Sequence, residues 1–347
     1  MGRQPRAERV TLADVALRAG VSSATVSKVL NGRTDVSART REHVLGVIAE
    51  TGYRSTTPRH DRPRRQALVV VVDFMASPYA GTVLQEILAA ATEKATDLLL
   101  RLPPDASIGA STKPAHTWIT QQQVAGAVGL IELAVAVPDT VLTAANECEL
   151  PIVTIDPIGT AGSRAVTIGS TNWAGGRSAT DHLIRFGHRR IAWIGGPVNS
   201  APSAERFHGY RAALEAADLA AERDLIRHDA FLVEAGFRHG HDMLSLPTPP
   251  TAVVAGNDEI AIGVLAAAKE LGVDVPRQCS VTGFDDTPQT EWTTPALTSV
   301  RQPLAGMGRM AVETVLGMAN GAQPASRHLQ LATALTVRDS TGPAPMD

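Results

Sequence analysis

The sequence predicts an α/β protein in which a small all-α domain with a helix-turn-helix precedes a larger, two-lobed domain built on parallel sheets. Three observations predict this fold class. Apolar residues recur at helical spacing between residues 11 and 53, with capping side chains ahead of them. From residue 67, short apolar runs alternate with stretches long enough to be helices, as in parallel sheets covered on both faces. The alternation restarts near Ile191, which indicates two similar subdomains.

The first fifty residues carry three successive helix signals. Thr11 and Asp14 fit a capping box for a helix that begins at the next residue, and Gly20 follows it where a tight turn requires a positive φ. Ser22 and Ser37 can cap a second helix, expected over residues 23–30, and a third. The apolar positions expected to face inward are Leu12, Val15, Ala16, Ala19, Val26, Val29, Leu30, Val44, Leu45, Val47 and Ile48.

The outward face of the second helix is unusually polar and small. Short hydrogen-bonding side chains suit DNA phosphates and base edges, so this face favours a helix that lies in the major groove. A plain three-helix bundle without a ligand is the alternative. The side chains concerned are Ser22, Ser23, Thr25, Ser27, Lys28 and Asn31.

Charge is distributed unevenly along the chain. Residues 1–65 hold 13 basic and 6 acidic side chains, a net of +7, whereas the remainder holds 19 basic and 29 acidic side chains, a net of −10. The whole-chain net of −3 conceals this asymmetry. A basic head on an acidic body indicates a small DNA-binding unit attached to a domain with another role.

Composition places the chain among folded proteins of the cytoplasm. A hydrophobic content of 44% with 19% charged residues is typical of packed domains, and 347 residues suffice for two or three of them. Cys148 and Cys279 alone make a disulfide framework an unlikely basis for the fold. No signal peptide is visible, and the longest apolar stretch, residues 124–137, is too short to span a bilayer. We therefore expect a cytoplasmic protein with no membrane contact.

The string TLADVALRAGVSSATVSKVLNG resembles the DNA-binding domain of the LacI/GalR family of bacterial transcription regulators. The resemblance implies that Ser23, Ala24 and Lys28 read bases. Position 28 is more often arginine in that family, and lysine lacks the rigid guanidinium fork, so the base preference there is open. Phosphate contacts are implied for Thr11, Ser22, Thr25, Ser27, Asn31 and Thr40.

A polar, proline-containing segment, residues 55–66, separates the predicted DNA-binding domain, residues 1–54, from the body. Members of the family usually place a short hinge helix here, with a leucine that enters the minor groove. This chain has no leucine between Tyr53 and Leu68, and Pro58 would interrupt a helix. We expect the segment to bind phosphates and to bend DNA weakly; a tether without DNA contact is the alternative. The arginines concerned are Arg54, Arg59, Arg62, Arg64 and Arg65.

Strands and helices alternate along the body. Strands are expected at residues 67–74, 124–131, 151–156, 191–197, 251–258 and 279–286, and helices at residues 77–95, 138–150, 204–218 and 259–272. Ligands in such open sheets bind at the carboxyl ends of the strands, and with two lobes the site is expected in the cleft between them.

The resemblance to the LacI/GalR family extends over the body, where LIRFGHRRIAWIGGP, TAVVAGNDEIAIGVLAAAKELGVDVP and VTGFDDTP look like effector-domain signatures. It implies a periplasmic-binding-protein-like fold, a small-molecule effector that is often a sugar, and three crossings between lobes. The effector domain is expected over residues 67–340, followed by a loose tail over 341–347. Its first lobe is expected over about 67–169 plus 300–329, and its second lobe over about 172–297 plus 331–340. The chain is expected to cross between the lobes near 169–172, 297–302 and 329–331.

Side chains at strand ends and helix starts are candidates to line the cleft, and the family resemblance narrows them to eight. Carboxylates accept hydroxyl hydrogens, arginine donates in a fork and aromatic rings stack on a sugar face. Three of the eight have an alternative role: Asn257 can cap a helix, Asp285 can serve a turn, and Arg206 can form a surface ion pair. The eight predicted contacts are Asp73, Ser77, Tyr79, Asp156, Arg206, Phe231, Asn257 and Asp285.

These observations and the resemblance to the LacI/GalR family predict a transcription regulator that acts as a repressor. We expect it to bind a pseudo-palindromic operator in double-stranded DNA as a homodimer. No hydrolase, nucleotide-binding or zinc-protease motif is present, so we expect no enzyme activity, no catalytic residues, no cofactor and no metal. A purine or nucleoside effector, an activator role and a stand-alone sugar-binding protein are the alternatives. No heptad tail follows the last strand, so a tetramer is not expected.

Overall fold

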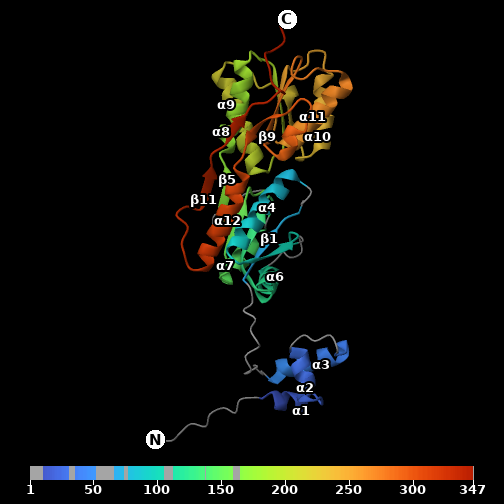
Figure 1. Ribbon diagram of the computed structural model, residues 1–347, viewed down its shortest axis with the longest axis vertical. Coiled ribbons are helices and arrows are strands. Elements are labelled where there is room, and N and C mark those ends of the chain that lie inside the picture. The colour runs from blue at the N-terminus through green and yellow to red at the C-terminus, as the bar shows by residue number, and fades with distance from the viewer. Residues whose placement is uncertain are drawn as a thin grey trace. The chain divides into compact units, whose positions relative to one another are not determined.

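A computed structural model gives the fold of the protein (Figure 1). The structure describes residues 11–30, 36–51, 66–73, 77–104, 112–136, 138–158 and 165–346. The chain divides into two compact units, residues 1–64 and residues 65–347. The first is helical and the second contains two sheets with helices on their faces, which confirms the predicted fold class.

Three helices form the first unit: α1 (Leu12–Arg18), α2 (Ser23–Leu30) and α3 (Ala38–Thr51). The predicted capping box is confirmed, since Asp14 N donates to Thr11 Oγ1 at 3.3 Å and Thr11 N donates to the Asp14 carboxylate at 2.8 Å. Gly20 has the predicted positive φ, +63°. The buried core consists of Val15, Ala16, Ala19, Val26, Val29, Val44 and Val47.

The serines predicted to open α2 and α3 do so. Ser22 Oγ accepts a hydrogen bond from Thr25 N at 3.1 Å, and Ser37 Oγ accepts one from Thr40 N at 3.2 Å. The side chains of the predicted core positions Leu30 and Leu45, and the linker arginines, lie outside what the structure describes.

The first lobe is built on a six-stranded, fully parallel sheet with the order β11-β5-β4-β3-β1-β2. Its strands are β1 (Ala67–Val71), β2 (Asp97–Arg101), β3 (Ala127–Leu133), β4 (Ile152–Ile155), β5 (Val166–Ser170) and β11 (His328–Leu331). Helices α4 (Pro78–Glu93) and α12 (Leu304–Ala319) cover one face, and α6 (Thr112–Val124) and α7 (Asp139–Glu147) cover the other.

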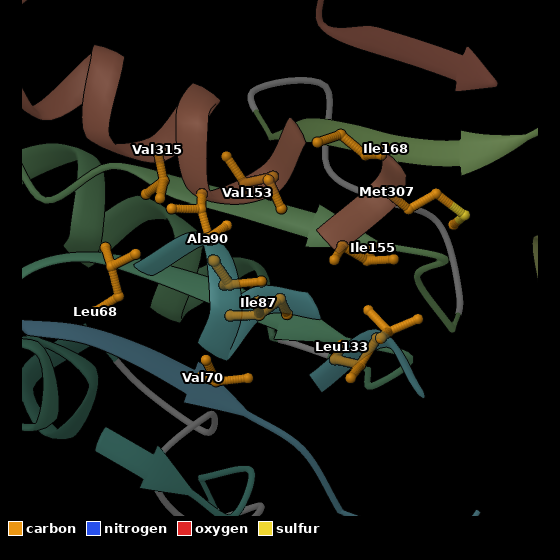
Figure 2. Packing of buried hydrophobic residues seen from close by; sticks show 14 of the residues in the cluster. Leu68, Val70, Ile87, Ala90, Leu133, Val153, Ile155, Ile168, Met307 and Val315 are labelled. Carbon is orange, nitrogen blue, oxygen red and sulfur yellow. The ribbon is translucent and has the colours of Figure 1, made fainter. Parts of the chain in front are cut away.

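Figure 2 shows the core between this sheet and its first helical layer. Ile87 of α4 and Met307 of α12 pack against Val70, Leu133 and Ile155 of the strands. All of these side chains are fully buried, so the sheet is apolar on this face without interruption. This packing explains why the sequence of these strands shows uninterrupted apolar runs.

The second lobe repeats the plan with the order β12-β10-β9-β8-β6-β7. Its strands are β6 (Ile191–Gly195), β7 (Ile226–His228), β8 (Ala252–Ala255), β9 (Ser280–Asp285), β10 (Thr298–Arg301) and β12 (Ala334–Thr336). Helices α8 (Asn172–Arg185) and α9 (Ala201–Ala216) cover one face, and α10 (Val233–Leu244) and α11 (Asp258–Leu271) cover the other. The sheet is parallel except for β12, which returns antiparallel to β10.

The chain passes between the two sheets three times. The connections run from β5 to α8, from β10 to α12 and from β11 to β12. The expected start of the first lobe's second segment at residue 300 is wrong, because residues 298–301 pair with β9 in the second sheet. That strand ends where Pro303, which has no N–H, follows it. The expected end of that segment at residue 329 is also early, because β11 continues to Leu331.

Two further expectations are corrected. The body has helices and strands that were not predicted from the sequence. They are β2, α6, β5, α8, β7, α10, β10, α12, β11 and β12. The carboxyl-terminal segment is not a loose tail, because Gly342 O accepts a hydrogen bond from the buried ring of His188 at 3.1 Å and Ala344 N donates to Phe186 O at 2.8 Å. Among the described residues, no helix is both long enough and apolar enough to cross a membrane.

Candidate functional site

A cavity of about 420 Å³ lies between the two lobes. Its size falls within the range of about 300–1,000 Å³ that is usual for small-molecule sites. The eight side chains predicted from the sequence all line it, four from each lobe: Asp73, Ser77, Tyr79 and Asp156 from the first, and Arg206, Phe231, Asn257 and Asp285 from the second. The topology brings them together because strand ends of both sheets face the cleft.

Arg206 is the most extensively bonded side chain of the cavity, and only 4% of it is exposed. Its Nε donates to Asn172 Oδ1 at 2.8 Å and its Nη1 donates to Gly256 O at 2.7 Å. Nη1 also lies 3.5 Å from the carboxylate of Asp285, and the guanidinium stacks 3.7 Å above the ring of Phe284. Arg206 is therefore fixed in place before any ligand arrives.

The two buried aspartates of the cavity end strands with unusual backbone geometry. Asp156 has a φ of +45° and Asp285 a φ of +108°, in the left-handed region that non-glycine residues seldom adopt. Burial raises the pKa of both carboxyls, and in both the charge of Arg206 opposes this without cancelling it. Asp285 also accepts a hydrogen bond from Gln302 Nε2 at 2.6 Å.

Aromatic rings complete the cavity on two sides. Tyr79 donates its hydroxyl hydrogen to Asp156 Oδ2 at 2.6 Å. Burial, followed by the charge of Asp156, raises the pKa of Tyr79 well above its usual value, so the hydroxyl stays protonated and remains a donor. The ring of Phe231 lies against Gly196, at a distance that leaves no room for a Cβ there.

Helix capping and cavity lining coincide at Asn257. Its Oδ1 accepts a hydrogen bond from Ile260 N at 2.9 Å, so the predicted alternative role as an N-cap of α11 is present alongside its position in the cavity. The neighbouring Asp258 is structural: it accepts hydrogen bonds from Thr287 N at 2.8 Å and Ser299 Oγ at 2.5 Å. Asp286 pairs with Arg301 and Arg338, away from the cavity lining.

The sequence reading missed Glu259, which lies in the first turn of α11 and lines the cavity. Ser77 Oγ, in the first lobe, donates to Glu259 Oε2 at 3.1 Å and so bridges the lobes. Ile158 and Ser200 form a second bridge as a short antiparallel backbone pair. The position of Glu259 two residues after a strand-ending asparagine is the sequence signal that could have identified it.

In the first unit, the predicted DNA contacts are arranged along α2. Ser23, Ala24 and Lys28 are exposed, whereas Thr25 and Ser27 are half-buried on the side of the helix nearer the core. The hydroxyls of Thr11 and Ser22 cap α1 and α2, which places them at helix amino termini suited to phosphate. Asn31, Arg54 and Arg59 lie outside the described residues.

A shallow hollow adjoins the amino terminus of α3. It is lined by Val21, Arg39, Thr40 and His43, and so places the predicted contact Thr40 between two basic side chains. Within the described ranges, no group of three histidine, cysteine or acidic side chains is placed to hold a metal ion.

Comparisons with known proteins agree with this architecture. Residues 11–55 match the family model of bacterial regulatory proteins of the lacI family, and residues 180–341 match that of the periplasmic binding protein-like domain. The regulator MalR of Streptomyces coelicolor is 33% identical over 96% of this chain and 97% of its own length.

Two solved structures are similar to the whole chain. The CelR–cellobiose complex is 30% identical, with a TM-score of 0.70, over 96% of this chain and all of that one. The lac repressor dimer bound to operator and the anti-inducer ONPF is 25% identical, with a TM-score of 0.69, over the same shares. The helix-turn-helix unit, the two-lobed domain and these full-length similarities show that the chain belongs to the LacI family of DNA-binding bacterial transcription regulators.

Proposed function

We propose that this protein is a cytoplasmic repressor that binds a pseudo-palindromic operator as a homodimer and changes its operator affinity when a small metabolite enters the cavity. The observation that carries the proposal is the convergence of eight polar and aromatic side chains from two lobes on one cavity of about 420 Å³. The cellobiose bound in the CelR structure supports a sugar as the ligand.

DNA recognition is assigned to α2 and its surroundings. Ser23, Ala24 and Lys28 are exposed on one helix and are proposed to contact bases. Proposed phosphate contacts are Thr11, Ser22, Thr25, Ser27, Asn31, Thr40, Arg54 and Arg59. The net charge of +7 over residues 1–65 supports binding that weakens steeply with salt.

Exposed leucines on the first lobe support dimerisation. Leu88 of α4 is 53% exposed, and Leu102, directly after the edge strand β2, is 71% exposed. Leu100 of β2 is 41% exposed. Burial of one leucine contributes about 1.5–3 kcal/mol, so a second copy of the chain that covered these side chains would gain binding energy from each.

The rings of Tyr79 and Phe231 favour a nucleoside as the second candidate ligand, because a base can stack on either ring. The residues that line the cavity are compatible with a sugar and with a nucleoside. Either ligand could release the protein from DNA or make it bind DNA more tightly.

The experiment that tests the function is operator binding by the full chain. Footprinting across the native promoter region, followed by fluorescence anisotropy on the protected sequence, should give a protected site with two-fold related halves. We expect its affinity to change when a cavity ligand is added. No protected sequence with or without sugars and nucleosides would refute the function.

A further inference from the structure

The charges that line the cavity are strongly unequal. Four carboxylates face it, from Asp73, Asp156, Glu259 and Asp285, whereas Arg206 is the one basic side chain among the described lining residues. Asp156 and Asp285 are buried, and the first turn of α11 adds Glu259 from the second lobe. Burial favours the neutral form of Asp156 and Asp285 because it raises their pKa, but the acidic groups of the lining still outnumber its single basic side chain.

The positive charge of Arg206 is already balanced within the protein. Its Nε donates to Asn172 Oδ1, its Nη1 donates to Gly256 O, and the carboxylate of Asp285 lies 3.5 Å from Nη1. A phosphate that approached this guanidinium would therefore have to compete with a buried counter-charge. The ring of Phe284, 3.7 Å away, occupies one face of the same group.

Three helices begin at the cavity, and a helix amino terminus commonly binds anions. Two of the three carry a side-chain cap of their own. Ser200 caps α9, which also has Pro202 in its first turn, and Asn257 caps α11, which has two acidic residues in its first turn. Helix α4 has no side-chain cap, but it begins at Pro78, which has no N–H to donate. The two capped ends are therefore poor sites for a phosphate.

The carboxylates have acceptor capacity to spare. An ionised carboxylate offers about four acceptor positions. In the described part of the chain, Asp156 receives one side-chain hydrogen bond, from Tyr79, and Glu259 receives one, from Ser77. Asp73 is exposed and also lines the cavity. The remaining acceptor positions can take hydrogen bonds from a ligand that supplies donors.

We propose that this cavity selects a polyhydroxylated ligand of zero or positive charge, such as a neutral sugar or an amino sugar, and rejects phosphorylated and carboxylated forms of the same molecule. The inference rests on the proposed function, because it takes the cavity as the effector site. Hydroxyl and ammonium groups supply the donors that the carboxylates lack, and the unequal lining repels an added negative charge.

The test is a thermal-shift comparison of the full chain with matched ligands that differ in charge. The probes are glucose with glucosamine and glucose-6-phosphate, maltose and cellobiose with their phosphates, and adenosine with its monophosphate. We expect neutral or amino members to raise Tm and each phosphorylated partner to need at least about tenfold more ligand for the same shift. A phosphorylated member that stabilises as well as its parent overturns the proposal, and so does a panel without any shift.

A charge-removing variant identifies the groups responsible. Glu259→Gln keeps an acceptor for Ser77 but removes a negative charge, so the preference for the neutral over the phosphorylated probe should fall about threefold or more. Glu215→Gln, on the exposed surface of α9, is the matched control and should change nothing. An unchanged preference in Glu259→Gln overturns the assigned role of that carboxylate. Operator binding is measured on the same samples, so that a failure of the DNA-binding function is seen separately from a failure of ligand selection.

Discussion

Both lobes bury carboxylates close to the cleft, but they surround them differently. Among the described residues of the first lobe, Glu132 has a single side-chain donor, Thr154 at 3.1 Å, and Asp156 has a single one, Tyr79 at 2.6 Å. In the second lobe, Asp258 accepts three hydrogen bonds, two from Thr287 and one from Ser299. Asp285 is held there by Gln302 and Arg206.

The difference indicates that the second lobe supplies a fixed wall and the first lobe an adaptable one. Carboxylates with several partners cannot turn without breaking a network, whereas a carboxylate with one partner keeps acceptor positions that a ligand hydroxyl can use. Mutations in the second lobe should therefore damage folding and binding together. Mutations in the first lobe should change ligand affinity with smaller effects on folding.

The largest effect is expected for Arg206→Ala. The change leaves Asp285 and Asp156 buried without their counter-charge, so the free energy of unfolding should fall by about 3 kcal/mol and the ligand-induced Tm shift should disappear. Urea denaturation and thermal shift measure both quantities. Arg177→Ala, which removes a half-exposed pair with Asp181, should cost less than about 1 kcal/mol. A ligand response retained in Arg206→Ala would contradict the fixed-wall account.

The second prediction concerns the pH dependence that Glu132 gives to the first lobe. Burial raises the pKa of Glu132 from 4.5 to about 8. The folded state then holds this proton more tightly than the unfolded state, so the contribution of Glu132 to stability falls as pH rises from 4.5 towards 8. Glu132→Gln should flatten that part of the stability curve.

Denaturation midpoints measured across this pH range compare wild type with Glu132→Gln. Glu313→Gln, an exposed site on α12, is the control and should follow the wild-type curve. Parallel curves for wild type and Glu132→Gln would show that the carboxyl is better solvated than its burial indicates.

Tyr79→Phe tests the single bond to Asp156. The variant keeps the ring but removes the donor, which should weaken ligand binding about tenfold and cost about 1–2 kcal/mol of stability. Isothermal titration with the sugar that gives the largest Tm shift measures the affinity. Tighter binding in Tyr79→Phe would mean that Tyr79 competes with the ligand for Asp156, and the donor role would be wrong.

The smallest effect is expected for Ser77→Ala, which removes the hydrogen bond to Glu259 between the lobes. The loss should be about 0.5–1 kcal/mol, seen as a few-fold weaker ligand affinity. Ser245→Ala, an exposed change on the second lobe, is the control. Equal affinities for Ser77→Ala and the control would show that this bridge does not help to hold the lobes together around the ligand.

Local signals in the sequence were enough to predict the helices of the first unit. The capping hydroxyls of Thr11, Ser22 and Ser37 act within three residues, so their roles follow from spacing alone. The cavity lining was also predictable, because parallel strands bring their carboxyl ends to one edge. Asp73 and Asp156 could be placed there without knowing their neighbours.

Features that depend on distant partners could not be predicted in the same way. The burial of the carboxyl-terminal segment depends on His188, 154 residues away along the chain from Gly342. The edge strand β2 has exposed positions and lacks an uninterrupted apolar run, and α6 has a weakly apolar face, so neither stands out by periodicity. Asp285 lines the cavity, whereas its neighbour Asp286 belongs to an ion-pair network. Both residues have positive φ values, which the sequence alone does not reveal.

The central claim is that occupation of the cavity is coupled to operator binding. The direct test is a fluorescence anisotropy titration of the full chain on its footprinted promoter sequence, with and without the sugar that gives the largest Tm shift. Wild type should change its operator Kd by about tenfold, within the usual coupling of 1–3 kcal/mol, and Arg206→Ala should bind the operator with no response to the sugar. An operator affinity that the sugar leaves unchanged in wild type, or changes equally in both proteins, would contradict the claim.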